Sequence, residues 1–318
     1  MKTEYKTFDS NHKVDLHTHT TFSDGLLTPE KLFEKAKSYK LKAISICDHD
    51  TIKAYEDRKT FSCAKRTGIE LIPGIEFSTI DKKGAKYHIL GFLIDIKNKN
   101  LKEFIKRIQK ERNSYVEKVC ELLNSDGWHI DAKKIIRTNI SITKAHISRN
   151  LLADKRNQVK IKEHFNKIPS EGEFTETLLI KGKKYFVNDK NKIKPEEAID
   201  IIHASKGVAI LAHPGFNIMG GEKIKNLCDN FKSMGIDGFE AINIQYDKRN
   251  KDKRVDYVKE FTKYCIENNL LFTGGSDFHH SNKKLIGKFI DLGFKNDKYS
   301  VSYDIVEKLK KYRNQKLK

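Results

Sequence analysis

Six histidines and three carboxylates stand at or beside the edges of short apolar runs that we expect to be strands. His17 and His19 leave the first run as His-x-His, and alternation along a strand places both imidazoles on one face. Mixed imidazole and carboxylate ligands suit Zn²⁺, Mn²⁺ or Fe²⁺ better than Mg²⁺ or Ca²⁺. The nine candidate metal ligands are His17, His19, Asp24, His49, Glu76, His88, His213, Asp277 and His279.

Nine candidates exceed the need of one ion, since a catalytic zinc takes about three protein ligands plus water. We therefore expect two to three divalent metal ions (Mn²⁺, Zn²⁺ or Fe²⁺), with a carboxylate that bridges a pair. Taken alone, the His-x-His pair is compatible with an incidental arrangement, and Asp24 with an ordinary turn aspartate. Ligand-type residues at six strand ends together favour a shared metal site.

Alternating strand and helix patterns must position these residues. The expected strands are residues 14–16, 43–46, 70–75, 87–93, 208–211, 238–242 and 270–273. The expected helices between them begin at Thr28-Pro29 and span residues 54–65, 195–205, 222–234 and 255–268. Repeated strand-then-helix units predict a mainly parallel sheet that closes, or nearly closes, into a barrel. Active sites of such barrels lie at the rim where the strands end.

The pattern between the two halves of this barrel is different. Apolar residues fall at helical spacing from Leu101 to Leu123, Gly127 ends the run, and a second helix is expected at 143–153. We expect residues 1–97 to form the first part of the barrel, 98–193 a helical insertion covering the active site, and 194–318 the second part.

The composition narrows the class of protein. The chain has 318 residues with 38% hydrophobic and 10% aromatic residues, which argues against a disordered chain. There is no apolar run long enough to span a bilayer and no signal-peptide pattern. Five cysteines without a Cys-x-x-Cys pair indicate reduced thiols and a cytoplasmic protein without a membrane role.

The net charge of +19 comes from 62 basic and 43 acidic residues, and most of the basic residues are lysines spread along the chain. Such a charge fits a solvated lysine-rich surface, and it also fits a basic funnel for a polyanionic substrate. The charge alone does not decide between them.

Six motifs in order carry a resemblance to a known family. They read HTHTTFSDG, ISICDHDT, PGIEFS, HILGF, LAHPG and GGSDFH, and they resemble the motifs of the PHP (polymerase and histidinol phosphatase) family of metal-dependent phosphoesterases. The resemblance covers residues 14–94 and 195–293. It implies an α/β fold, a distorted (β/α)7 barrel with a mostly helical insertion subdomain, and a trinuclear metal site.

The resemblance also implies a division of the ligands among three ions. One ion would be held by His17, His19, Glu76 and Asp277. Glu76 would bridge to a second ion, which is also held by His88 and His213. The third would be held by Asp24, His49 and His279.

Paired metal ions suggest the chemistry. They lower the pKa of a shared water, and the resulting hydroxide can attack phosphorus while the ions neutralise the phosphate oxygens. No protein nucleophile is required. Asp48 and Asp50 flank His49, where each could orient an imidazole, handle a proton, or simply stabilise a turn.

The insertion favours one branch of the family. Residues 142–149 and the stretch 185–215 resemble nucleoside 3′,5′-bisphosphate phosphatases and 5′-to-3′ oligoribonucleases of the RNase AM type. The expected substrate is thus a phosphorylated small molecule or a short oligonucleotide, and no stable protein partner is inferred. The candidates for substrate binding are Arg149, Arg112 and His146, since a guanidinium fork matches phosphate oxygens. A surface or packing role is open for each.

Two other functions remain open at this point. One is a phosphatase of another small metabolite, such as histidinol phosphate. The other is a nucleic-acid-binding module without catalysis, like the PHP domains that are attached to DNA polymerases. An intact set of nine candidate ligands favours an enzyme over a binding module.

Overall fold

The computed structural model describes residues 13–180, 182–187, 193–247, 253–279, 290–295 and 297–318. The stretch 185–215 that carries part of the resemblance therefore includes residues 188–192, which lie outside the described residues, as do residues 1–12 of the expected first barrel part. Among the described residues, no helix combines the length and apolar character needed to cross a membrane.

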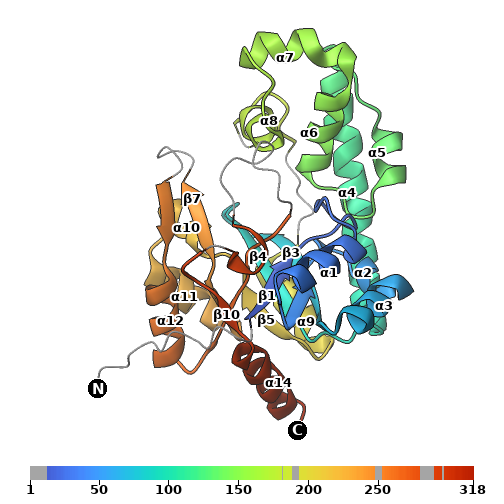
Figure 1. Ribbon diagram of the computed structural model, residues 1–318. Coiled ribbons are helices and arrows are strands. Elements are labelled where there is room, and N and C mark those ends of the chain that lie inside the picture. Colours follow the sequence, from blue (N-terminus) through green and yellow to red (C-terminus); the bar gives the residue numbers. More distant parts are fainter. Residues whose placement is uncertain (1–12, 181, 188–192, 248–252, 280–289, 296) are drawn as a thin grey trace.

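One eight-stranded sheet forms the core of the molecule (Figure 1), with the strand order β10-β1-β2-β3-β4-β5-β6-β9. Its strands are β1 (Lys13–Thr18), β2 (Ala43–Ile46), β3 (Glu70–Ile80), β4 (Lys86–Phe92), β5 (Val208–Leu211), β6 (Gly238–Ile242), β9 (Leu271–Gly274) and β10 (Val301–Ser302). Beyond β9 the chain pairs back onto β1: the Phe278 carbonyl accepts from the His19 N–H at 2.9 Å. This pairing nearly closes the sheet into a barrel, as the sequence predicts.

Most strand pairs are parallel, but β4 runs antiparallel to both β3 and β5. The reason is local, because only residues 81–85 separate β3 from β4, and such a short link permits only a hairpin. Strand β3 also continues to Ile80, beyond the expected end at residue 75. As a result Glu76 lies inside a strand and not after one.

Helices cover the outside of the barrel (Figure 1). They are α1 (Pro29–Ser38), α2 (Lys53–Glu56), α3 (Arg58–Thr67), α9 (Pro195–Ala204), α10 (Gly215–Met219), α11 (Ile224–Ser233), α12 (Val258–Glu267) and α14 (Asp304–Lys316), with a short 3₁₀ turn η3 (Leu292–Phe294). Helix α1 begins as expected: Thr28 accepts from the Lys31 N–H at 3.4 Å, and Pro29 occupies the first turn.

Two helix predictions need correction. The helix expected at 54–65 is two helices, because Asp57 adopts an extended conformation and its side chain caps α3. The helix expected at 255–268 begins only at Val258, because residues before it form β8 (Lys253–Asp256), which pairs with β7 (Ile244–Asp247). Strand β8 contains a single apolar residue, Val255, so its sequence gives no alternation that would separate it from the helix that follows.

The segment between β4 and α9 is helical, as expected. It comprises α4 (Lys99–Ser125), α5 (Ala132–Thr138), α6 (Lys144–Ala153), η1 (Lys155–Asn157), α7 (Gln158–Phe165) and α8 (Glu171–Leu178). These helices lie above the barrel in Figure 1. They share a separate apolar core around Trp128 and Phe174.

Helix α4 belongs to both apolar cores. Its first half places Leu101, Ile105 and Ile108 in the barrel core, while its second half places Val119 and Leu123 in the core of the insertion. One continuous helix thus joins the insertion to the barrel.

At the barrel end opposite the histidines, buried Asp237 precedes β6 and receives four donors. Its carboxylate accepts from the Ala209 N–H at 2.8 Å, from the Tyr312 hydroxyl at 2.8 Å, and from His203 and Lys316. Burial opposes ionisation, but His203 and Lys316 lower the pKa of Asp237 below its ordinary value. The group therefore attaches the C-terminal helix α14 to the barrel.

We expect Asp237→Asn to lower the free energy of unfolding by about 2 kcal/mol, because hydrogen bonds to a charged group are lost around a buried site. Since the folded-state pKa is depressed, the loss should be present at neutral pH and should fade only as pH falls below about 4, toward the lowered pKa. Urea unfolding at pH 7 and pH 3 would measure it. Asp200→Asn, at an exposed position on α9, is the matched control. Equal midpoints for both variants would contradict the assignment.

Candidate metal centre

The fold brings all nine candidate ligands to one rim of the barrel. Each strand delivers its ligand according to its direction: His17 lies near the end of β1, while His213 follows β5 and Asp277 follows β9. Strand β4 is antiparallel, so its beginning lies at the same rim and carries His88. The reversed strand explains why His88 lies near the beginning of its strand and still reaches this rim.

The carboxylate of Glu76 lies at the centre and is completely buried. Its Oε1 is 3.0 Å from His88 Nδ1 and 3.0 Å from His213 Nε2. Its Oε2 is 2.9 Å from His49 Nδ1 and 3.3 Å from His19 Nε2. The two oxygens thus face different imidazoles, which is the geometry of a carboxylate shared between two ions.

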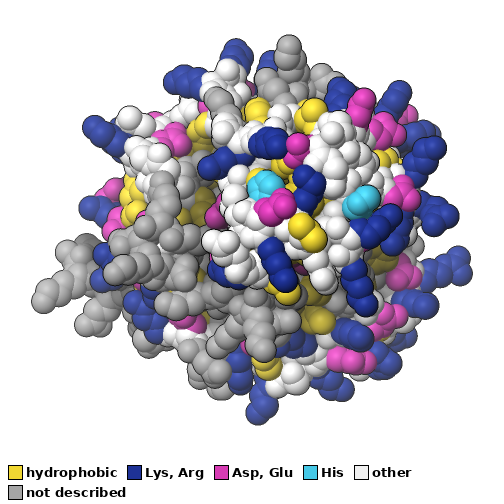
Figure 2. All heavy atoms as spheres, turned by 90° about the horizontal axis from the view of Figure 1, so that it is seen from above, with side chains coloured by type: hydrophobic (Ala, Val, Ile, Leu, Met, Phe, Trp, Pro, Cys, Tyr) yellow, Lys and Arg dark blue, Asp and Glu magenta, His cyan; other side chains and the backbone are white. Residues whose placement is uncertain are grey.

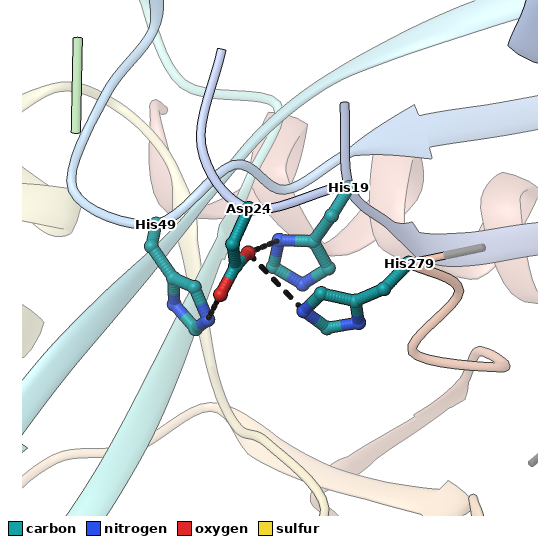
Figure 3. A group of neighbouring side chains, drawn as sticks. All are labelled: His19, Asp24, His49 and His279. Carbon is teal, nitrogen blue, oxygen red and sulfur yellow. Dashed lines mark ion pairs between the residues drawn. The ribbon is translucent and has the colours of Figure 1, made fainter. Parts of the chain in front are cut away.

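Three groups of ligand atoms each lie within 4.8 Å of one another. They are His17, His19, Glu76 and Asp277; His49, Glu76 and His88; and His19, Asp24, His49 and His279. Figure 3 shows the last group, in which the Asp24 carboxylate points toward three imidazoles. Asp24 oxygens lie 3.2 Å from His279 Nε2, 3.8 Å from His19 Nδ1 and 3.8 Å from His49 Nε2.

Buried polar atoms without a hydrogen-bond partner test whether metal ions fit here. Burying such an atom unpaired costs free energy, so an accumulation of them indicates a missing partner. Half of the atoms of this kind among the described residues belong to the candidate ligands: His17 Nε2, His19 Nε2, Asp24 Oδ1, His49 Nδ1, Glu76 Oε2 and His213 Nδ1. Imidazole nitrogens and carboxylate oxygens together form a donor set for Zn²⁺, Mn²⁺ or Fe²⁺, so the residues fit a metal centre.

The site is electrostatically strained without cations. Burial works against charge on every member, yet the neighbouring imidazoles lower the pKa of Asp24, Glu76 and Asp277 well below the ordinary carboxyl range. The carboxylates in turn raise the pKa of His49 to about 9, against the effect of burial. Burial dominates at His88 and lowers its pKa to about 4. The carboxylates and imidazoles of the cluster therefore stabilise each other's charged forms.

A second carboxylate layer orients the ligands, and the sequence analysis missed it. Glu240, buried in β6, accepts from His17 Nδ1 at 2.9 Å and from the His213 N–H at 2.7 Å. The first bond fixes the His17 tautomer and turns Nε2 toward Glu76. A carboxylate inside the apolar strand GFEAI was the available signal in the sequence.

Asp15 and Asp48 hold the ligand-bearing loops. Buried Asp15 accepts from the Ser276 N–H at 3.0 Å and from the Gly293 N–H at 2.7 Å, next to Asp277. Burial raises the pKa of Asp15 to about 6 against these hydrogen bonds. Asp48 accepts from the Thr20 N–H at 2.7 Å and from the Ser23 hydroxyl at 2.6 Å, next to Asp24. The contacts of Asp48 are thus to the loop that carries Asp24.

Asp50 and Arg112 contact each other. The Arg112 guanidinium forms an ion pair with Asp50 and donates to the Ile142 carbonyl at 2.6 Å and to the Ser78 hydroxyl at 3.1 Å. Asp50 also accepts from the Ser78 N–H at 3.0 Å. This contact joins α4 of the insertion to β3 of the barrel.

Arg149 and His146 come close to the site from α6. Arg149 donates to the Glu171 carboxylate at 2.8 Å and to the Asp24 carbonyl at 3.4 Å. His146 is buried, and its Nδ1 accepts from the Thr143 N–H at 3.1 Å. Burial lowers the pKa of His146. The insertion therefore touches the Asp24 loop, whereas a substrate-binding role for these residues stays a prediction.

Comparisons with known proteins identify the family of this chain. The PHP domain family model matches residues 15–201. A 5′-3′ exoribonuclease from Haemophilus influenzae is 31% identical, over 88% of this chain and 95% of that protein. A 3′,5′-nucleoside bisphosphate phosphatase from Chromobacterium violaceum is 26% identical, over 84% of this chain and 87% of that protein.

A solved structure from Bifidobacterium adolescentis, described as a metal-dependent phosphoesterase, has the same fold. It superposes with a TM-score of 0.74 over 95% of this chain and 96% of that chain, at 22% identity.

We expect Glu240→Gln to weaken divalent metal binding by about 10- to 100-fold, because an amide orients the His17 ring less firmly than a carboxylate does. Competition with a chromophoric chelator would measure the affinity. Glu260→Gln, on the surface helix α12, is the control and should bind metal like the parent. Parent-like affinity in Glu240→Gln would show that the carboxylate is dispensable.

Metal binding at pH 7 should release protons, because His17 and His49 have raised pKa values in the metal-free site while ligation requires neutral imidazoles. Apparent affinity should therefore rise as pH increases from 6 toward 9. Calorimetric titration of Mn²⁺ in buffers of different ionisation enthalpy counts the protons released. Release of no proton at pH 7 would contradict the raised pKa values.

Proposed function

Because this chain belongs to the PHP domain family, we propose that it is a metal-dependent hydrolase of phosphate esters in nucleotides. The proposed substrates are nucleoside 3′,5′-bisphosphates, from which it removes phosphate, and short RNA, which it trims from the 5′ end. The names of the relatives from Haemophilus influenzae and Chromobacterium violaceum support this choice. The five cysteines are buried and free, which supports a cytoplasmic location.

The observation that carries the proposal is the position of Glu76 between two sets of imidazoles. We propose that two to three divalent ions bind and that Glu76 is shared between two of them. His17, His19 and Asp277 would hold the first ion, and His88 and His213 would hold the second. Asp24, His49 and His279 would hold the third ion. Bound ions of this kind supply an activated hydroxide near neutral pH and neutralise phosphate oxygens.

The chain itself shapes the space for the phosphate. A cavity of about 240 Å³ opens at the rim, and His49, His88, His213 and Asp277 form part of its wall. Among the described residues that line it, none is a serine, threonine or cysteine. In the proposed reaction the nucleophile is a metal-activated hydroxide and not a protein side chain, and Asp48 and Asp50 act by holding the loops around the site.

The charge of the insertion fits a polyanionic substrate. Residues 98–193 carry 22 basic and 12 acidic side chains, which is more than half of the excess of 19 in the whole chain. Figure 2, viewed from above the insertion, shows these basic side chains spread across the face and mixed with acidic ones. A field of this kind increases the encounter rate with nucleotides without selecting a sequence.

We expect phosphate release in Mn²⁺ to be strongest from adenosine 3′,5′-bisphosphate within a panel that also holds adenosine 5′-monophosphate and histidinol phosphate. His17→Ala should lose at least about 100-fold in kcat/KM, because one of the proposed metal ligands is removed. His129→Ala, in the insertion and outside the site, is the control. Preference for histidinol phosphate would select the metabolite phosphatase. Absence of release from every compound, with metal bound, would contradict the proposal.

A further inference from the structure

Part of the wall of the rim cavity contains no metal ligand. It is formed by Lys86 and Tyr87 at the start of β4 and by Phe216 and Asn217 in α10. Asn217 Nδ2 donates to the Lys86 carbonyl at 3.0 Å and so joins α10 to β4. Lys86 and Phe216 therefore lie on two directly connected elements beside the metal centre.

Phe216 presents an uncovered ring to this cavity. The residue is 50% exposed, and its ring centroid lies 5.2 Å from that of His213 at an interplanar angle of 73°. Of the large hydrophobic side chains that are exposed among the described residues, it alone lines the cavity. Covering this ring with a planar molecule would lower the free energy, because apolar surface would be removed from water.

Lys86 supplies a charge that is not used within the described structure. It precedes His88 by two residues, so both side chains leave the same face of β4. Lys86 is exposed, and its amine has no hydrogen bond or ion pair with any described residue. By contrast, the guanidinium groups of Arg112 and Arg149 are paired with Asp50 and Glu171.

We propose that Phe216 and Lys86 form the nucleoside subsite of the enzyme. The Phe216 ring stacks on the base, and the Lys86 ammonium binds the phosphate of the nucleotide that is not being hydrolysed. Every base has a π-face, so this subsite selects nucleotides over base-free phosphate esters without selecting among bases. The inference rests on the proposed function and specifies which residues give it nucleotide selectivity.

The test of Phe216 is a ratio of specificities. We would measure kcat/KM for adenosine 3′,5′-bisphosphate and for ribose 5-phosphate with Mn²⁺. In Phe216→Ala the ratio of the first to the second should fall about 10-fold, since stacking on one base is removed, and Phe216→Trp should restore it. Phe61→Ala removes a ring of similar exposure from α3 and should keep the parent ratio.

The test of Lys86 is a comparison of two nucleotides. Lys86→Gln should lose about 10-fold more kcat/KM on adenosine 3′,5′-bisphosphate than on adenosine 3′-monophosphate, because only the first carries a second phosphate. Lys86→Arg should retain the preference. Lys82→Gln changes an exposed lysine in the β3–β4 turn and serves as the control.

Binding without metal gives a readout that does not depend on activity. Calorimetric titration of adenosine 3′,5′-bisphosphate in the presence of a chelator should show weaker binding by Phe216→Ala and Lys86→Gln than by the parent. Equal affinities, or an unchanged specificity ratio in a parent that hydrolyses nucleotides, would overturn the subsite and leave the proposed function intact. A parent that hydrolyses ribose 5-phosphate but neither hydrolyses nor binds nucleotides would overturn the proposed function itself.

Discussion

The structure depends on the burial of many polar ligand atoms in one small volume. Glu76 has no exposed surface, and five imidazoles reach its two oxygens from four different strands or strand ends. Such a cluster is costly in a low-dielectric interior unless cations compensate it. The segments that carry His17, His19 and Asp277 also pair with each other, since the His19 N–H donates to the Phe278 carbonyl and the Phe278 N–H donates to the His17 carbonyl. The same backbone hydrogen bonds therefore join the two ends of the sheet and bring these ligands together.

The residues behind the ligands follow from this constraint. An imidazole that is free to rotate would turn a buried nitrogen away from its ion, so each ring needs a partner on its other side. Glu240 performs this role for His17, and the Asp277 carbonyl performs it for His279 at 2.9 Å. Asp15 and Asp48 act one step further out by holding backbone N–H groups of the ligand loops. Mutation of these residues would change metal binding without removing a ligand.

Sequence reasoning was strong where the evidence lay in local motifs. The strands at 43–46, 208–211 and 238–242 have the expected bounds, and ligand motifs follow the first two directly. It was weak where the role of a residue depends on a partner distant in sequence. Glu240 orients His17, which is 223 residues away. Arg112 forms its ion pair with Asp50, which lies in another part of the chain. A carboxylate in a strand and an arginine on a helix carry no local mark of such partners.

The insertion contacts the barrel and the segments around the metal site directly. Helix α4 packs in both apolar cores, Arg112 pairs with Asp50 beside His49, and Arg149 reaches the Asp24 carbonyl from α6. Relative movement of the two parts would have to break an ion pair and disturb a helix shared by both cores, which costs several interactions at once. Phe216, which lines the rim cavity, lies on the barrel, whereas more than half of the excess of basic residues lies in the insertion. Under the proposed function, the barrel would orient a nucleotide in the cavity and the charge of the insertion would attract it. The contacts between the two parts hold them in one relative position.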